Sequence, residues 1–169
     1  MSLDEHRERG PVHLPVVVIT VSDTRALEDD TGGALLVELL EKAGHQVVGR
    51  AIVRDEVDAI RAAVDAAIMR DDVRAVLLTG GTGIAPRDVT PEALAPLLDR
   101  QIPGFGELFR SLSYTEIGSA AMLSRALAGV ARGRLVVGLP GSRAAIRLAL
   151  EKLLLPELAH LADEAAKGP

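Results

Sequence analysis

The first half of the chain alternates apolar runs with stretches of helical periodicity, and this order constrains the fold more than any other feature. The runs 15–22, 46–53 and 74–78 are typical of strands, and the first is apolar throughout 16–19, as in a strand buried on both faces. Between them, apolar residues recur at helical spacing over 32–43 and 55–70. The order predicts an α/β fold, with a single doubly wound, mostly parallel open sheet and helices on both faces.

The second half continues the pattern less clearly. It predicts helices over 91–98, 107–113, 119–127, 144–154 and 157–166, a strand over 134–137, turns at 102–106 and 138–142, and an interruption at Pro156. No internal repeat or low-complexity linker divides the sequence. We therefore predict one domain over 15–169, preceded by a flexible N-terminal arm over 1–14.

Composition excludes several classes of function. The 169 residues contain no cysteine, and the four histidines are scattered, so we expect no zinc and no haem. The net charge of −5 and an aromatic content of 2% argue against a nucleic-acid partner. No apolar run approaches the roughly 20 residues of a membrane span, and the charged N-terminus does not resemble a signal peptide. We expect a cytoplasmic protein with no membrane partner.

A glycine-rich loop follows the third predicted strand. Gly80, Gly81 and Gly83 lie between Thr79 and the start of the next predicted helix, with Thr82 among them. Glycines let the backbone approach a bulky anion, and the loop amides and threonine hydroxyls can donate hydrogen bonds to phosphate. The spacing matches neither the Walker A loop nor the dinucleotide fingerprint. The loop therefore predicts a phosphate site of another kind, although glycines also gather in ordinary turns.

Acidic residues accompany the predicted strand ends. Asp23 follows the first strand, Asp55 the second, and Arg87-Asp88 the glycine loop. Since ligands of doubly wound sheets bind at the carboxyl ends of the strands, we expect these residues at one rim. Carboxylates beside a phosphate need a cation between them, which implies Mg²⁺. The alternative is that Asp55 and Asp88 only stabilise helix N-termini.

Two other segments are open to both a functional and a structural interpretation. Pro140-Gly141-Ser142 forms a second turn whose helix start could bind an anion or serve only as a cap. Ser124-Arg125 could reach an anionic group or lie on a helix surface. The apolar segment Leu108–Leu127 is either part of an interface between subunits or part of the core.

Together these motifs resemble the MoaB/MogA family of molybdenum cofactor biosynthesis proteins, and the MoaB branch in particular. The resemblance spans about residues 15–160 and rests on the order of its motifs. They are Thr-Val-Ser-Asp (20–23), Asp30-x-Gly, Thr-Gly-Gly-Thr-Gly (79–83), Arg-Asp-Val-Thr-Pro-Glu-Ala (87–93), Pro-Gly-Phe-Gly-Glu (103–107), Ser124-Arg125 and Leu-Pro-Gly-Ser (139–142). Arg143, after the last motif, departs from many relatives.

The resemblance implies adenylylation of molybdopterin, in which Mg-ATP and molybdopterin give adenylyl-molybdopterin and pyrophosphate. It implies an open α/β sheet, assembly as a homotrimer or homohexamer, and other molybdenum cofactor biosynthesis proteins as partners. Asp55 and Asp88 correspond to the family's acidic pair, and we expect them to hold the Mg²⁺. The implied substrate- and nucleotide-binding residues are Ser22, Asp23, Thr79, Gly80, Gly81, Thr82, Gly83, Arg87, Ser124, Arg125, Pro140, Gly141 and Ser142.

Two other functions fit the same residues. The first is a molybdopterin-binding carrier or scaffold without turnover, in which the loop amides hold the pterin phosphate and the aspartates are helix caps. The second is a domain of the CinA type that acts on a different nucleotide.

Overall fold

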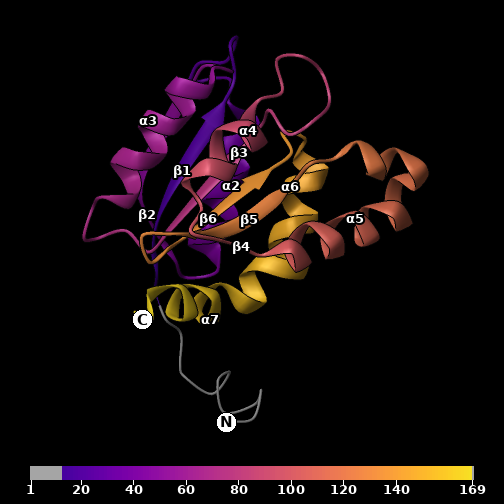
Figure 1. Ribbon diagram of the computed structural model, residues 1–169. Coiled ribbons are helices and arrows are strands. Elements are labelled where there is room, and N and C mark those ends of the chain that lie inside the picture. Colours follow the sequence, from indigo (N-terminus) through magenta and orange to yellow (C-terminus); the bar gives the residue numbers. More distant parts are fainter. Residues whose placement is uncertain (1–12, 169) are drawn as a thin grey trace.

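The computed structural model describes residues 13–168, which fold around one open sheet (Figure 1). The strands are β1 (Pro15–Val21), β2 (Gln46–Val53), β3 (Ala75–Thr79), β4 (Arg100–Gln101), β5 (Leu127–Ala131) and β6 (Arg134–Leu139). Their order in the sheet is β2-β1-β3-β6-β5-β4. Strands β1, β2, β3 and β6 are parallel, whereas β5 runs antiparallel to β6 and β4 antiparallel to β5. The predicted mostly parallel open sheet is confirmed.

Helices cover both faces of this sheet. They are α2 (Thr31–Lys42), α3 (Val57–Ile68), α4 (Thr90–Leu94), α5 (Pro103–Ile117), α6 (Arg143–Ala149) and α7 (Leu155–Ala166). One core cluster joins the sheet to α2, α5, α6 and α7, and the other joins it to α3 and α4. No helix of the described residues has both the length and the apolar character needed to cross a membrane.

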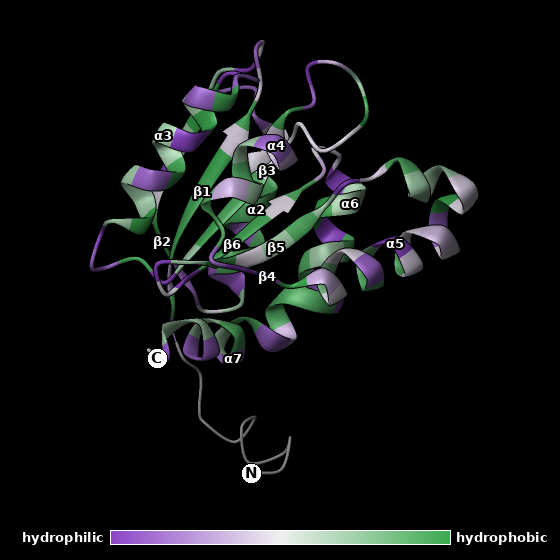
Figure 2. Cartoon of the chain, in the orientation of Figure 1, coloured by the Kyte–Doolittle hydropathy of each residue, from purple (hydrophilic) through white to green (hydrophobic). Residues whose placement is uncertain are grey.

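The alternation of side chains along β1 shows why this strand is apolar throughout. Val16 and Val18 belong to the cluster beneath α2, whereas Val17 and Ile19 belong to the cluster beneath α3. Figure 2 shows the same arrangement, with hydrophobic strands between helices that are hydrophobic on one side only. Full burial of each such side chain contributes about 1.5–3 kcal/mol. The central strand therefore holds the two helical layers together.

The N-terminal arm predicted over 1–14 lies almost wholly outside the described residues. Of its last two residues, which are described, Leu14 is buried in the core cluster beneath α2.

The predictions for residues 102–131 were partly wrong. Helix α5 begins at Pro103, where a turn was expected, because proline suits the first position of a helix. The expected helix 119–127 is a 3₁₀ turn (Gly118–Leu123) followed by β5. Strands β4 and β5 were missed, since β4 has only two residues and Leu-Ala-Gly-Val-Ala contains a single β-branched residue. Gly129 is needed here because a Cβ would lie 2.5 Å from the Arg100 carbonyl oxygen.

Contrary to the prediction, Pro156 does not interrupt the C-terminal helix. Helix α6, a π-helical turn (Leu150–Leu154) and α7 follow one another directly, and Pro156 lies in the first turn of α7. Within a regular α-helix the proline ring would clash with the carbonyl four residues earlier. The wider π turn precedes the proline at the point where that clash would occur, so the chain stays helical.

Candidate functional site

Four parallel strands end at one edge of the sheet, and the segments that follow β1, β3 and β6 enclose a cavity. Its volume is about 340 Å³. The wall is formed largely by Ser22 after β1, Thr79 and Gly80 at the end of β3, and Gly141 and Ser142 after β6. The rim predicted from the strand ends therefore exists, and five of the predicted binding residues line one cavity there.

Glycines allow the backbone segments around this cavity to lie in contact. Gly80 has φ +104°, and a Cβ at this position would lie 2.4 Å from the Val21 carbonyl oxygen. A Cβ on Gly141 would lie 3.5 Å from the Cα atom of Gly80. The Thr79 hydroxyl donates to the Pro140 carbonyl at 2.9 Å and joins the two turns. Part of the wall is therefore main chain, as a phosphate-binding loop requires.

Two helices begin beside the cavity. Asp30 caps α2 by accepting a hydrogen bond from the Gly33 amide at 2.9 Å, and Ser142 caps α6 by accepting one from the Ala145 amide at 3.2 Å. The N-terminus of a helix carries partial positive charge and free N–H groups, both of which favour an anion. Arg143 donates to the Thr31 carbonyl at 3.0 Å and thereby links the two helix starts.

Asp30 is the most deeply buried charged residue of the site, with 1% of its surface exposed. Burial by itself would raise the pKa of its carboxyl. Hydrogen bonds from the Gly33 amide, the Thr20 hydroxyl and Arg50, together with the charge of Arg50, outweigh burial and lower that pKa. The Thr20 hydroxyl lies at 2.7 Å and the Arg50 guanidinium at 3.0 Å. Asp30 is therefore ionised and holds α2 against β1 and β2.

Asp23 and Asp88 lie near enough to Asp55 for their charges to act on its carboxyl. Burial raises the pKa of Asp55, and the charges of Asp23 and Asp88 raise it further, while a backbone hydrogen bond from Asp23 and the charge of Arg87 oppose the rise. Asp23 accepts a hydrogen bond from the Asp55 amide at 3.2 Å and pairs with Arg87. The excess negative charge that raises the pKa of Asp55 would be relieved by a cation.

Gly81 and Gly83 of the loop separate these acids. A Cβ on Gly81 would lie 3.3 Å from a carboxylate oxygen of Asp55, and one on Gly83 would lie 2.7 Å from a carboxylate oxygen of Asp88. The two predicted catalytic acids therefore flank the same short loop. The Asp88 carboxylate also accepts a hydrogen bond from the Ala85 amide at 2.9 Å, which closes a turn.

Arg125 fixes the outer half of this loop. Its amide donates to the Thr82 carbonyl at 2.8 Å, and its guanidinium donates to the carbonyls of Gly83 at 2.8 Å and Asp88 at 2.6 Å. The same guanidinium pairs with Glu92, which lowers the pKa of that carboxyl. Arg125 thus acts as a clamp on the loop, from a position 42 residues away along the chain.

A second cavity, of about 450 Å³, lies beyond the clamp. Asp88, Glu92 and Arg125 line it together with Ile84 and Pro86. The hydroxyl of Ser124 accepts a hydrogen bond from the Ala126 amide at 3.4 Å and supports the turn before β5. Ser124 and Arg125 are therefore beside the loop, away from the first cavity, and the binding roles predicted for them remain predictions.

Sequence reasoning left three polar residues of this region out of the predicted site. Asp30 and Arg25 line the first cavity, and the buried Thr90 hydroxyl donates to the Gly80 carbonyl at 2.8 Å. The Asp30-x-Gly motif was a usable signal. No side-chain cap is present at the start of α4, and the Thr90 hydroxyl stabilises the glycine loop.

The described residues contain no group of three or more His, Asp or Glu side chains arranged to hold a metal ion. Magnesium commonly binds proteins through one or two carboxylates, with substrate phosphates and water as the remaining ligands. Asp55 and Asp88 are suited to that kind of site, in which the protein supplies only part of the ligand set.

The chain matches the family model described as the probable molybdopterin binding domain over residues 17–160. The chain belongs to this family. The molybdenum cofactor biosynthesis protein B of Bacillus subtilis is 52% identical over 168 residues, which cover 99% of each chain. A crystal structure of a molybdenum cofactor biosynthesis protein B is similar with a TM-score of 0.90 and 51% identity, covering 93% of this chain and 98% of that one.

A structure of MogA is also similar, with a TM-score of 0.81 and 31% identity, covering 90% of this chain and 99% of the other. The resemblance to the MoaB/MogA family noted in the sequence is therefore confirmed, and the higher identity is to the MoaB proteins.

Proposed function

We propose that this protein acts in molybdenum cofactor biosynthesis by binding molybdopterin and transferring AMP to it from Mg-ATP. The names of its relatives support the first part of this proposal. The second part is supported by the meeting of glycine-walled main chain, two helix starts and three carboxylates at one edge of the sheet. This convergence is the observation that carries the proposal. A molecule with several phosphates needs N–H groups that bind its oxygens, and carboxylates that hold the cation which balances its charge.

In the proposed reaction, an oxygen of the molybdopterin phosphate attacks the α-phosphorus of ATP. The new P–O bond forms as the bond between the α-phosphorus and the bridging oxygen breaks, and pyrophosphate leaves with that oxygen. The phosphate supplies its own nucleophile, so positioning and charge stabilisation account for most of the catalysis. The Gly80–Gly83 amides and the start of α6 would bind phosphate oxygens, and Ser22 and Arg25 would line the entrance.

Asp55 and Asp88 would hold Mg²⁺, which neutralises negative charge on the phosphates. Burial raises the pKa of Asp55 most, and the charges of Asp23 and Asp88 raise it further. A cation held there would offset the repulsion between these carboxylates. Arg87, paired with Asp23, supplies a positive charge to the same group.

The proposal is tested by incubating the protein with molybdopterin, Mg²⁺ and ATP labelled at the α-phosphate. A labelled pterin product is expected. The Asp88→Ala variant is expected to bind molybdopterin without metal about as well as the wild type but to lose turnover. If this variant transfers AMP normally at saturating Mg²⁺, the assignment of Asp88 is wrong.

A carrier or scaffold function is the second candidate. It is favoured by the hydrogen bond from the Ala85 amide to Asp88, which shows that this carboxylate also has a structural role. Calorimetric titration separates the two candidates, because a carrier binds molybdopterin but has no need of Mg-ATP. Heat of binding from molybdopterin together with none from Mg-ATP would favour the carrier.

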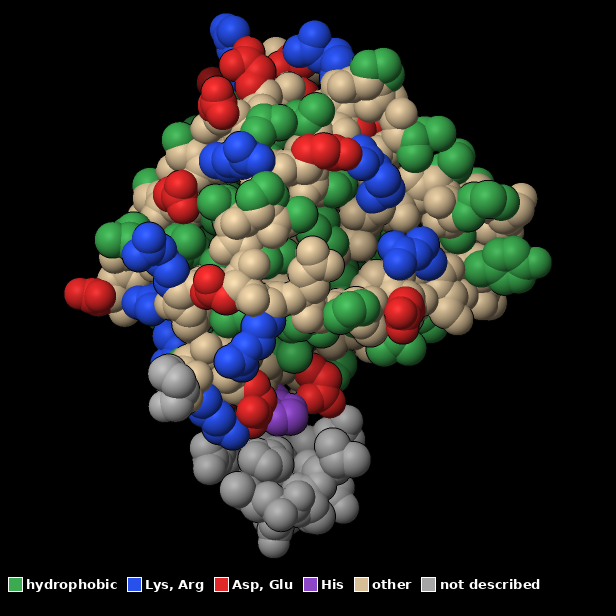
Figure 3. Space-filling view, viewed as in Figure 1, with side chains coloured by type: hydrophobic (Ala, Val, Ile, Leu, Met, Phe, Trp, Pro, Cys, Tyr) green, Lys and Arg blue, Asp and Glu red, His purple; other side chains and the backbone are tan. Residues whose placement is uncertain are grey.

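We also propose that the protein forms a homotrimer or homohexamer, with other molybdenum cofactor biosynthesis proteins as further partners. The end of α5 and the following 3₁₀ turn project from the sheet and expose large apolar side chains (Figure 3). Tyr114, Ile117 and Met122 are each at least 60% exposed. Light scattering on the wild type and on Ile117→Ser tests the self-association. Met69→Ser, which changes an exposed apolar residue at the C-terminal end of α3, is the control. A monomeric wild type would contradict it.

A further inference from the structure

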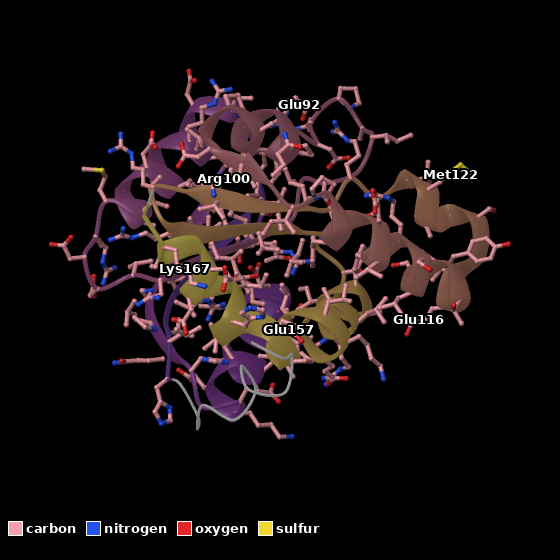
Figure 4. All side chains as sticks on the ribbon, turned by 60° about the horizontal axis from the view of Figure 1, so that its bottom comes forward. Glu92, Arg100, Glu116, Met122, Glu157 and Lys167 are labelled. Carbon is pink, nitrogen blue, oxygen red and sulfur yellow. The ribbon has the colours of Figure 1, made fainter. Side chains whose placement is uncertain are left out.

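A third cavity lies at the opposite edge of the sheet from the candidate site. Its volume is about 550 Å³. It is bounded by the starts of β3 and β6, the turn between β5 and β6, strand β4 and the end of α7. Figure 4 shows Arg100 and Lys167, from two of these elements, on the same side of the molecule. The proposed function makes no use of this cavity.

Positive charge is concentrated around this cavity. Five basic residues line it, against three acidic ones, in a chain with a net charge of −5. The basic residues are Arg74, Arg100, Arg132, Arg134 and Lys167. Two of them have acidic partners, since Arg74 pairs with Asp163 and Lys167 pairs with Glu164. The other three form no ion pair with any carboxylate among residues 13–168.

The guanidinium of Arg134 is held in place by neutral groups only. It donates to the carbonyls of Val73 at 3.2 Å, Arg132 at 2.8 Å and Arg70 at 3.2 Å. Carbonyl groups orient a guanidinium without removing its charge. The side chains of Arg100 and Arg132 form no hydrogen bond with any described residue and are exposed beside it. The cavity therefore has one fixed and two free arginines.

Arg132 occupies a backbone position that arginine does not favour. The β5–β6 turn has two residues, Arg132 and Gly133, with φ +49° and +73°, and Ala131 pairs with Arg134 across it. Such turns strongly favour Asn or Gly at the first position. Asp99 stabilises the turn by accepting a hydrogen bond from the Arg132 amide at 2.7 Å. A bulky residue that keeps a left-handed backbone conformation at the edge of a cavity is typical of a functional position.

We propose that this cavity binds a small molecule that carries phosphate groups, with Arg100, Arg132 and Arg134 as its main contacts. Arginine presents a planar fork of donors that matches phosphate oxygens. The volume suits a compact ligand with two phosphates, and the charged lining disfavours an apolar one. Glu164 pairs with Lys167, and Asp99 accepts a hydrogen bond from the Arg132 amide. Together with Asp71 these acids are outnumbered by the five basic residues, so the lining of the cavity keeps an excess of positive charge.

Inorganic pyrophosphate is the probe, followed by amide chemical shifts in NMR spectra of the full chain. Saturable shifts at Val130 and Gly133 are expected. Arg132→Gly removes the charge and suits the turn, so it should fold and melt no lower than the wild type while binding here about tenfold more weakly. Arg132→Lys should retain part of the affinity. Arg147→Gln, which removes the same charge outside the cavity, is the control.

Shifts at Gly80 and Gly141 report the candidate site separately, and neither substitution at Arg132 should change them. The inference is overturned if Val130 and Gly133 do not shift, or if Arg132→Gly binds pyrophosphate at this cavity as tightly as the wild type. It is also overturned if citrate shifts the same amides with equal affinity, because the cavity would then respond to negative charge and not to phosphate. Inorganic phosphate is expected to bind more weakly than pyrophosphate, since it can contact fewer of the arginines.

Discussion

The clamp formed by Arg125 leads to a quantitative prediction for the Arg125→Met variant. Methionine keeps the apolar part of the side chain but removes the hydrogen bonds to the Gly83 and Asp88 carbonyls and the ion pair with Glu92. A hydrogen bond from a charged group contributes about 1.5–3 kcal/mol. Because the side chain is 35% exposed, each of the two bonds is expected near or below the lower end of that range.

The exposed ion pair with Glu92 adds only about 0.5 kcal/mol. Arg125→Met should therefore lower the free energy of unfolding by about 2–3 kcal/mol, whereas Glu92→Gln should lower it by about 0.5 kcal/mol. Arg125→Lys should lose most of the same energy, because a single ammonium cannot contact three acceptors in the same way. Urea denaturation of the three variants gives these differences directly.

Hydrogen exchange locates the effect. If Arg125 acts as a clamp, amides of residues 82–90 should exchange faster in Arg125→Met, while those of β1 and β3 should lose protection only in proportion to the global stability. An Arg125→Met variant with wild-type stability and unchanged exchange over 82–90 would refute the role of this residue as a clamp.

Three further predictions concern the acids and glycines of the candidate site. Folding raises the pKa of Asp55, so ionisation of this carboxyl lowers the stability of the fold as pH rises above the unfolded pKa of about 4. Asp55→Asn should therefore be more stable than the wild type at pH 7, by less than about 1 kcal/mol. Urea denaturation at pH 4 and pH 7 tests this, and an Asn variant less stable than the wild type at pH 7 would contradict it. Folding lowers the pKa of Asp30, so the stability that this carboxylate contributes is complete above its unfolded pKa and disappears as pH falls through its folded pKa. Asp30→Ala should lower the free energy of unfolding by about 3–5 kcal/mol at pH 7, because Arg50 is left unpaired. A loss of stability that did not become smaller in acid would count against this explanation. Gly81→Ala should cost about 2–3 kcal/mol in urea denaturation, because φ is +69° and the new Cβ would lie 2.5 Å from the Thr90 hydroxyl, whereas Gly104→Ala, with no atom within 4 Å, should be neutral or stabilising; equal effects of the two changes would rule out backbone strain as the cause.

The first half of the fold could be predicted because the local sequence pattern is enough to determine each of its elements. The apolar run of β1 and the periodic leucines of α2 permit only one kind of element each. Strand β5 was missed because its place in the sheet depends on a neighbour: Gly129 is suited to the close approach of β4, which lies far from it in sequence. Pro156 misled for a similar reason, since the π turn that accommodates it has no signature in the sequence.

The candidate site could be predicted as far as its rim. The residues after β1, β2, β3 and β6 meet because parallel strands end together, which follows from the order of elements alone. The division of roles within the rim could not be predicted. That Arg125 is engaged by loop carbonyls, and that Asp30 pairs with Arg50, depends on side-chain distances between segments that the sequence does not relate.

The main-chain wall formed by Gly80 and Gly141 has a consequence for how this protein can change over evolutionary time. A recognition surface made of side chains can acquire a new preference through a single substitution. Here any side chain added to Gly80 would collide with the carbonyl of Val21, so the surface is closed to that route. New ligand preferences must instead arise at the edge of the cavity, at positions such as Arg25 and Arg143. A replacement there changes the side chains around the cavity and leaves its main-chain wall unchanged.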